Sequence, residues 1–296
     1  MPLPLSSADK IAAYAIHPPN PTTQFLAIEH SQAVHRINLI NEWDPAITTG
    51  TRILELGCGQ GTCTQALAHA VSPSGHITAI DPASPDYGAP FTLAQAQSHL
   101  SSGALGPLIT FERADPVSFL NAIPKDAEPQ WDVAVLAHCI WYFPSASSLD
   151  EILSALRGRV KRVCIAEWAL QATELAALAH VLAALARATC EAHRTGSKEN
   201  IQTTLSPRAI REAAVRAGWK VEKEGVVVPV RELSDGFWEV GTVVDEEFLE
   251  DVEREVEDER VKAVLRAARD ATVAAAKAGV GKVRSMDVWV ATLVSE

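Results

Sequence analysis

The stretch RILELGCGQGTCTQALAHA, residues 52–70, joins an aliphatic run containing one acid to three alternate glycines and a helix-compatible sequence. The aliphatic run is typical of a buried strand, and the residues after Gly61 are typical of a helix. A glycine-rich turn between a strand and a helix lets a ligand approach the backbone, where the free amide groups of the helix can donate hydrogen bonds. The stretch therefore predicts a ligand site where this strand ends.

The rest of the chain repeats the alternation of strands and helices. Strand-like runs occupy residues 51–57, 76–81, 108–113, 131–137 and 162–168, and two more occupy residues 218–230 and 285–294. Because the early runs are apolar on both faces and alternate with helix-compatible segments, they predict an α/β fold with a doubly wound, mostly parallel seven-stranded sheet. We expect residues 1–50 to form an N-terminal helical lid and residues 51–296 to form one domain with a helical insertion at about 170–217.

The balance of charge argues against a nucleic-acid substrate. The 296 residues include 37 acids and 26 lysines and arginines, which gives a net charge of −11. Residues 245–260 alone hold ten acids against two arginines. A chain this acidic, without a basic stripe, is poorly suited to bind nucleic-acid phosphates. Because Phe248, Leu249 and Val252 recur at helical spacing within this acidic run, we expect it to form a solvated helix face.

The apolar runs and the cysteines indicate in which cellular compartment the protein is expected. The longest apolar run, residues 175–186, is too short to span a bilayer, and the first residues do not resemble a signal peptide. The five cysteines form no pair with metal-finger spacing and are interpreted as reduced thiols. These features predict a cytoplasmic protein with no membrane partner and no bound metal, and they leave its oligomeric state open.

The spacing of the glycines separates two kinds of nucleotide-derived cofactor. Dinucleotide sites use the pattern G-x-G-x-x-G to bring the backbone close to a pyrophosphate. Here the order is Glu55-x-Gly57-x-Gly59-x-Gly61, which is one residue tighter and begins with an acid. An acid beside this turn would repel phosphates but would suit a ligand that carries an amino group and a sulfonium. A nicotinamide dehydrogenase is therefore disfavoured.

With the motif LELGCGQG, Asp81 at the end of HITAIDP and Asp115 in ERADP, the chain resembles the class I S-adenosylmethionine-dependent methyltransferases from about Thr51 to Trp168. The phrases GCGQGTCT, AIDPASPDYGAPFTLAQAQ and SKENIQTTLSP further resemble a group of fungal small-molecule methyltransferase-like proteins. The resemblance implies S-adenosyl-L-methionine as the cofactor and S-adenosyl-L-homocysteine as the product. It implies no particular acceptor.

The resemblance also implies which residues bind the cofactor. The glycine loop would receive the methionine portion, Asp81 the ribose hydroxyls and Asp115 the adenine amino group. Asp81 could instead cap a turn, and Asp115 could instead cap the following helix. Glu55 lies within an apolar strand and needs a partner to offset its desolvation. The complete set of predicted cofactor contacts is Tyr14, Glu55, Gly57, Cys58, Gly59, Gly61, Asp81, Pro82, Ala114, Asp115 and His138.

Deprotonation of a hydroxyl or amine acceptor calls for a base, most often a histidine or a carboxylate. His138 and Glu167 follow the fourth and fifth strands, and His30 lies on the predicted lid, so these three are the candidate catalytic residues. His138 could instead be a loop residue bonded to backbone, and Glu167 a member of a structural ion pair. Tyr14, His35 and His17 are further lid candidates, and Trp141, Tyr142 and Trp168 are predicted to line the substrate pocket.

We therefore expect methyl transfer to an oxygen or nitrogen of a small aromatic or heterocyclic metabolite. Two alternatives stay open. The chain could bind S-adenosylmethionine without methylating, for example in a rearrangement, or it could serve as a regulatory or scaffold protein through its sheet edge and acidic helix.

Overall fold

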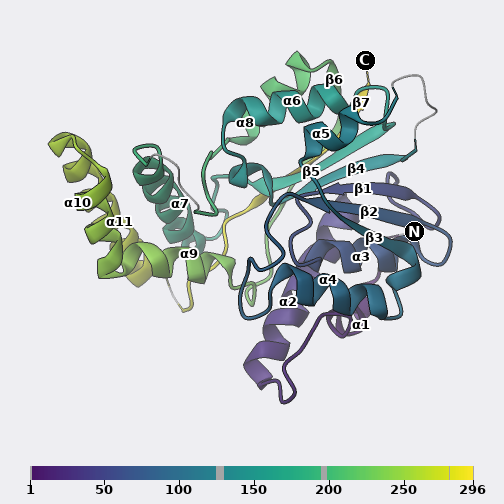
Figure 1. Ribbon diagram of the computed structural model, residues 1–296. Helices are drawn as coiled ribbons and strands as arrows, with labels where there is room; N and C mark the ends of the chain where they lie inside the picture. Colours follow the sequence, from purple (N-terminus) through teal and green to yellow (C-terminus); the bar gives the residue numbers. More distant parts are fainter. Residues whose placement is uncertain (1, 125–129, 195–198, 280, 296) are drawn as a thin grey trace.

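The computed structural model describes residues 2–124, 130–194, 199–279 and 281–295. A seven-stranded sheet crosses the molecule in the order β3-β2-β1-β4-β5-β7-β6 (Figure 1). Its strands are β1 (Arg52–Leu56), β2 (His76–Asp81), β3 (Ile109–Arg113), β4 (Val133–Ala137), β5 (Arg162–Trp168), β6 (Trp219–Val227) and β7 (Val288–Ser295). β1 to β5 are parallel, and β7 pairs antiparallel with both β5 and β6. The predicted fold class is confirmed.

β1 lies in the interior of the sheet because its residues can be buried on both faces. Ile53 and Leu54 are 0% exposed and point to opposite faces of the strand. β1 pairs with β2 on one side and β4 on the other, where Glu55 lies opposite Ala79 and Val135. The chain reverses its strand order at this point, so the carboxyl ends of β1 and β4 flank the position where such sheets bind ligands.

Helices cover both faces of the sheet, as Figure 1 shows. One face carries α1 (Ala8–Ala12), α2 (Thr23–Glu42), α3 (Thr62–Val71) and α4 (Leu93–Ser102). The other carries α5 (Pro116–Asn121), α6 (Ala146–Leu156) and α8 (Pro207–Arg216). A buried tryptophan attaches each helix layer to the sheet. Trp43 Nε1, just after α2, donates to Ile165 O of β5 at 3.2 Å. Trp219 Nε1, at the start of β6, donates to Leu153 O of α6 at 2.9 Å.

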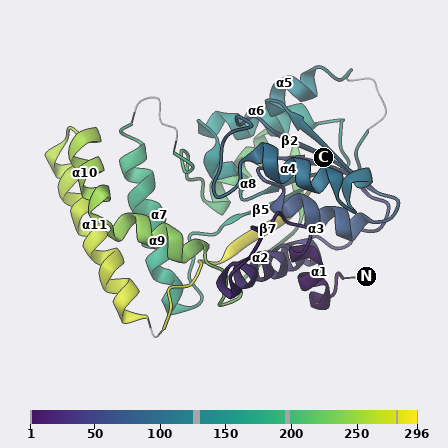
Figure 2. The ribbon, with the colours of Figure 1, turned by 60° about the horizontal axis from the view of Figure 1, so that its bottom comes forward.

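A helical lobe stands beside the sheet (Figure 2). It consists of α7 (Leu178–Glu191), α9 (Asp235–Val244), α10 (Glu246–Glu255) and α11 (Glu259–Ala278). Ala183, Val243, Phe248 and Leu265 meet in its own hydrophobic core. The arrangement differs from the expected insertion at 170–217, because α8 packs on α6 and β6 while α9 to α11 join α7. The acidic run 245–260 forms α10 and the start of α11, with Phe248 and Val252 buried.

The N-terminal segment, predicted to be a helical lid, contains the short helix α1 and the long helix α2. α2 packs on α1 and α3 and also contacts β6 and β7. Its middle reaches the carboxyl edge of the sheet, where His35 contacts His138. No described helix is both long and apolar enough to cross a membrane.

Candidate active site

The glycine loop between β1 and α3 adopts a backbone that favours glycine at three positions. Gly57, Gly59 and Gly61 have φ angles of 71°, 53° and 92°. A Cβ atom added at Gly57 would lie 2.6 Å from Cys139 Cβ, and one at Gly61 would lie 2.6 Å from Leu100 Cδ1. A Cβ atom at Gly59 would meet nothing within 4 Å. Protein packing therefore requires the outer glycines, whereas the middle glycine borders open space.

Asp81 joins the end of β2 to this loop. Its Oδ2 accepts a hydrogen bond from Gly59 N at 2.8 Å, and its Oδ1 accepts one from Ala83 N at 2.9 Å. The turn-capping interpretation is therefore satisfied. Each carboxylate oxygen has a further lone pair, so the same side chain can also accept bonds from ligand hydroxyls.

A cleft of about 340 Å³ opens beside Gly59 and Asp81. Five of its lining residues are among the predicted site residues: Gly57, Gly59, Asp81, Pro82 and Tyr142. Phe143, in the aromatic run after His138 that predicts a pocket wall, also lines it. The remaining lining residues, which the sequence analysis did not assign, are Ala83, Tyr87, Leu93, Cys139, Glu199, Asn200 and Gln202. The available signal for Tyr87, Asn200 and Gln202 was their presence in the phrases PDYG and SKENIQTT, of which residues 197 and 198 lie outside the described residues.

Glu55 lies beneath the loop rather than in the cleft wall. It is 2% exposed, and its Oε2 accepts a hydrogen bond from Thr64 Oγ1 at 2.6 Å. Burial raises the pKa of Glu55 to about 7, although hydrogen bonds from Thr64 and Cys63 and the charge of Arg36 oppose the rise. Glu55 can therefore influence a bound amino group only through neighbouring groups.

The remaining predicted cofactor contacts lie further from the cleft. Asp115 Oδ1 accepts a hydrogen bond from Ser118 N at 2.8 Å, so Asp115 caps α5 as its alternative interpretation held. Ala114 N donates to Asp81 O at 3.2 Å, and Cys58 is buried with its own N bonded to Ile80 O at 3.2 Å. Tyr14 turns towards α3, where its hydroxyl lies 3.5 Å from His69 Nδ1. The structure does not place Tyr14 in the cleft wall.

His30 and His35 take opposite roles on α2. The side chain of His30 is 48% exposed and contacts Asp9 on α1, with 2.7 Å between Nδ1 and Oδ1. His30 therefore faces away from the site, which corrects its prediction as a base. His35 is 1% exposed, and its Nε2 lies 3.0 Å from His138 Nε2. His17 contacts the backbone of Ala12 instead.

His138 occupies the carboxyl end of β4 in a left-handed conformation, with a φ of 55°. Its Nδ1 lies 3.7 Å from Glu167 Oε1, and its ring centroid lies 4.4 Å from that of Trp168. Burial lowers the pKa values of both His138 and His35 well below their usual range. The two imidazoles are therefore neutral near pH 7 and able to accept a proton.

Glu167 supports His138 from the end of β5. Its Oε2 accepts from Ile140 N at 3.0 Å, and its Oε1 accepts from Trp168 N at 3.0 Å. Burial raises the pKa of Glu167 to about 7 against these backbone hydrogen bonds. A carboxylate facing His138 Nδ1 favours a proton on that nitrogen, so His138 Nε2 accepts a hydrogen bond from His35 Nε2.

The predicted pocket aromatics occupy three different environments. Tyr142 is 50% exposed and lines the cleft. Trp168 is almost buried and lies between the rings of His138 and His180. Trp141 is 2% exposed, and its Nε1 donates to Leu205 O at 2.9 Å. Trp141 is thus a core residue, which corrects its placement in the pocket wall.

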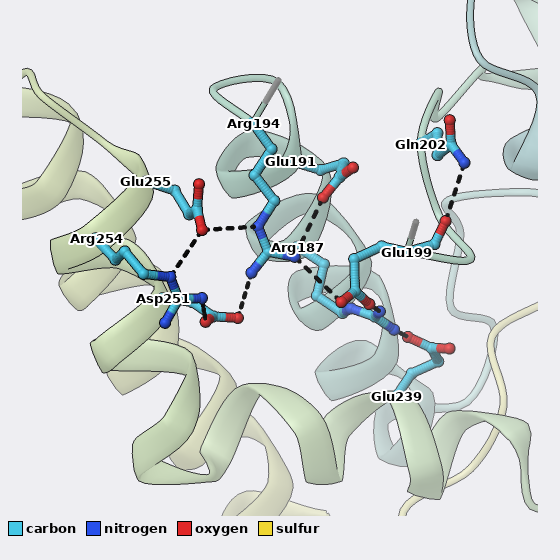
Figure 3. A network of polar contacts seen from close by, with 9 residues as sticks. All are labelled: Arg187, Glu191, Arg194, Glu199, Gln202, Glu239, Asp251, Arg254 and Glu255. Atoms are coloured by element: carbon cyan, nitrogen blue, oxygen red, sulfur yellow. Dashed lines mark hydrogen bonds and ion pairs between the residues drawn. The ribbon is translucent and has the colours of Figure 1, made fainter. Parts of the chain in front are cut away.

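Residues 199–205, here called the strap, pass between the cleft and the helical lobe. Figure 3 shows Glu199 between two arginines, with 3.2 Å separating it from Arg187 Nη2 and from Arg194 Nη1. On the other side, Gln202 N donates to Trp141 O at 2.8 Å. Held at Glu199 and at Gln202, the strap places Asn200 in the cleft wall, where its Oδ1 accepts a hydrogen bond from the Tyr87 hydroxyl.

We expect Asp81→Asn to weaken binding of S-adenosylhomocysteine by about 1 to 3 kcal/mol, roughly 5- to 150-fold. The neutral amide would weaken charge-assisted bonds to the ribose hydroxyls. Titration calorimetry would measure the change. Asp258→Asn is a matched control, because Asp258 also accepts two backbone amides but caps α11 in the helical lobe. Equal affinities of wild type and Asp81→Asn would leave Asp81 with its turn-capping role alone.

Comparison with known proteins gives consistent matches. The family profile described as a methyltransferase domain matches residues 53–162. Methyltransferase phomM' of Diaporthe leptostromiformis is 34% identical over 280 residues, covering 81% of this chain and 72% of that protein. A cyclopropane-fatty-acyl-phospholipid synthase-like protein from Lactobacillus casei has a TM-score of 0.83 at 29% identity, covering 98% of this chain and 99% of that one. The [4+2]-cyclase SpnF, 15% identical with a TM-score of 0.51 over 89% and 81% of the two chains, shares the fold alone.

Proposed function

We propose, because this chain belongs to the class I S-adenosylmethionine-dependent methyltransferases, that it methylates an oxygen or nitrogen of a small aromatic or heterocyclic metabolite. The family supplies the cofactor and the reaction type. When bound, S-adenosylmethionine supplies a methyl group already activated on a sulfonium. The chain's own residues must then bind, orient and deprotonate the acceptor.

The cleft residues fit the cofactor. Open space beside Gly59 admits a ligand close to the backbone, and Asp81 retains lone pairs for ribose hydroxyls. Gly57 and Gly59 would hold the methionine end, with Pro82 and Leu93 along the adenosine. Glu55, beneath the loop, would favour the amino group over a phosphate.

The observation that carries the proposal is the neutral histidine pair at the ends of β4 and α2. His35 Nδ1 is buried without a hydrogen-bond partner among the described residues. An acceptor that donates a proton there could pass it through His35 Nε2 to His138, while Glu167 stabilises the resulting positive charge. Hydroxyl and amine acceptors carry such a proton, whereas the carbon of an acyl chain does not.

The neighbouring surfaces support an aromatic acceptor. Tyr142 and Phe143 line the cleft. Glu199 borders both the cleft and a second cavity of about 460 Å³ between α7, α9 and α10, which Phe237 and Trp238 also line. Exposed aromatic side chains at a ligand site can stack against a planar ring.

The name of the Lactobacillus casei protein suggests an acyl-chain acceptor as a second candidate. Gln32 and His35 each have a buried polar atom without a hydrogen-bond partner among the described residues. An apolar chain placed there would leave these atoms unsatisfied, at a cost of about 1 to 3 kcal/mol each. We therefore rank the acyl acceptor below a polar one.

A labelled-methyl transfer assay tests the proposed function. The purified protein, given S-adenosylmethionine with an isotopically labelled methyl group and pools of phenols, amines and nitrogen heterocycles, should place the label on oxygen or nitrogen. Mass spectrometry and NMR would locate it, with Gly59→Val protein as the inactive control. Label found only on acyl-chain carbon, or only on macromolecules, would contradict the proposal.

A further inference from the structure

Arg36 lies on the face of α2 that points towards the active site. Residues three and four positions apart share one face of a helix, so Gln32, His35 and Arg36 project together. His35 contacts His138, and Gln32 Nε2 donates to Asp235 Oδ2 at 2.8 Å. In Figure 2, α2 lies beside β7 and α3. The helix α3 begins directly after Gly61, the last glycine of the loop.

The guanidinium of Arg36 lacks a counterpart. Its Nε is buried without a hydrogen-bond partner, and no ion pair or hydrogen bond within the described ranges holds the rest of the group. Gln32 Oε1 and His35 Nδ1, on the same helix face, are also buried without partners in this part of the chain, but both are acceptors and suit a donor group of a ligand. A charged group with a buried, unpaired N–H is costly, so the half-buried guanidinium of Arg36 indicates an anionic group on the ligand.

The packing of α2 places this helix face near the glycine loop: α2 packs on α3, which begins directly after Gly61, and His35 contacts His138. The positive charge of Arg36 lowers the pKa values of Glu55, Glu167 and Asp235, although burial raises all three more strongly. It also acts on Cys63, in the first turn of α3, where burial again has the larger effect and raises the pKa. Glu55 is the last residue but one of β1, beneath the loop, so Arg36 lies on the loop's side of the site.

We propose that Arg36 binds the α-carboxylate of the methionine portion of S-adenosylmethionine. Apart from Arg36, this carboxylate would meet acidic side chains around the loop, namely Glu55, Asp81 and Glu167. The amino end of the ligand suits those acids, whereas the carboxylate needs a cation. A guanidinium can hold a carboxylate through two parallel N–H···O bonds. The inference rests on the cofactor and not on the acceptor proposed above.

The test compares two ligands that differ only in the carboxylate. Calorimetry would measure the affinities of S-adenosylmethionine and decarboxylated S-adenosylmethionine for wild type, Arg36→Met and Arg36→Lys. We expect wild type to prefer the carboxylate-bearing ligand by roughly 10- to 100-fold, Arg36→Met to lose that preference, and Arg36→Lys to keep part of it. Arg113→Met, which removes an exposed arginine at the end of β3, should keep the wild-type preference.

Two results would overturn the assignment. Arg36→Met could keep the full preference for the carboxylate-bearing ligand, or it could lower the affinities for both ligands equally. Either result would make Arg36 a structural residue or a contact of the acceptor. If circular dichroism shows that Arg36→Met does not fold, Arg36→Lys decides. An unchanged preference in that variant, with affinities equal to wild type, would reject the bidentate contact. Because no acceptor is needed, a failed transfer assay would leave this result unaffected.

Discussion

Gly59→Val is expected to abolish binding of S-adenosylmethionine while leaving the fold intact. The added Cβ would meet no protein atom within 4 Å, so its branches would occupy the open space at the cleft. The φ of 53° adds backbone strain, at about 1 to 2 kcal/mol for a residue with a side chain. We expect at least a hundredfold loss of affinity, which corresponds to about 3 kcal/mol. Calorimetry with S-adenosylhomocysteine would measure it.

Gly158→Val is the matched control for backbone strain. Gly158 also has a positive φ, 76°, and a Cβ atom there would likewise meet nothing within 4 Å. It follows α6, away from the cleft. Both variants should therefore lose similar thermal stability, and only Gly59→Val should lose the ligand. Retained affinity in a folded Gly59→Val protein would remove the glycine loop from the cofactor site.

His138→Ala is expected to lower turnover at least a hundredfold while leaving cofactor affinity nearly unchanged. A positioned base typically contributes 10² or more to the rate. His35→Ala should have a similar effect, and the double variant little more, because the two rings would act as one unit. Steady-state kinetics with the acceptor found by labelled transfer would measure these effects. Turnover of His138→Ala within about tenfold of wild type would exclude the base role.

A merely orienting histidine would behave differently. It would change KM or cofactor affinity, and His138→Asn or His138→Gln would restore part of the activity. The turnover number separates the two roles, since neither amide side chain can act as a base at neutral pH.

The pH dependence of the same reaction should follow Glu167 rather than the imidazole. The sequence alone predicts a rate that rises through the usual histidine pKa, but burial lowers the pKa of His138 well below that range. His138 is then already neutral at pH 6.5. Glu167, whose pKa burial raises to about 7, gains its charge as the pH rises and stabilises protonated His138. The rate should rise through about pH 7, and Glu167→Gln should remove that rise.

Much of the fold and part of the cleft follow from local sequence. The runs 76–81 and 162–168 predict β2 and β5 at their observed bounds, because a strand buried on both faces needs a continuous apolar run. Gly59 and Asp81 could be placed in the site for a related reason. In a parallel sheet, the residues that follow neighbouring strands meet at one edge, whatever the rest of the chain does.

Tertiary structure alone decided which distant segments meet. His30 and His35 are five residues apart, about 140° around the helix, and only the packing of α2 on the sheet turned His35 inward and His30 outward. Arg36, Tyr87 and Asn200 could not be placed for the same reason, since their partners come from elements far along the chain. The helical lobe is a further case: α7 cannot bury its apolar face by itself, and the segment that covers it, α9 to α11, begins more than forty residues after α7 ends. Side-chain spacing specifies the faces of each element, whereas the free energy of burial between elements decides which faces come together.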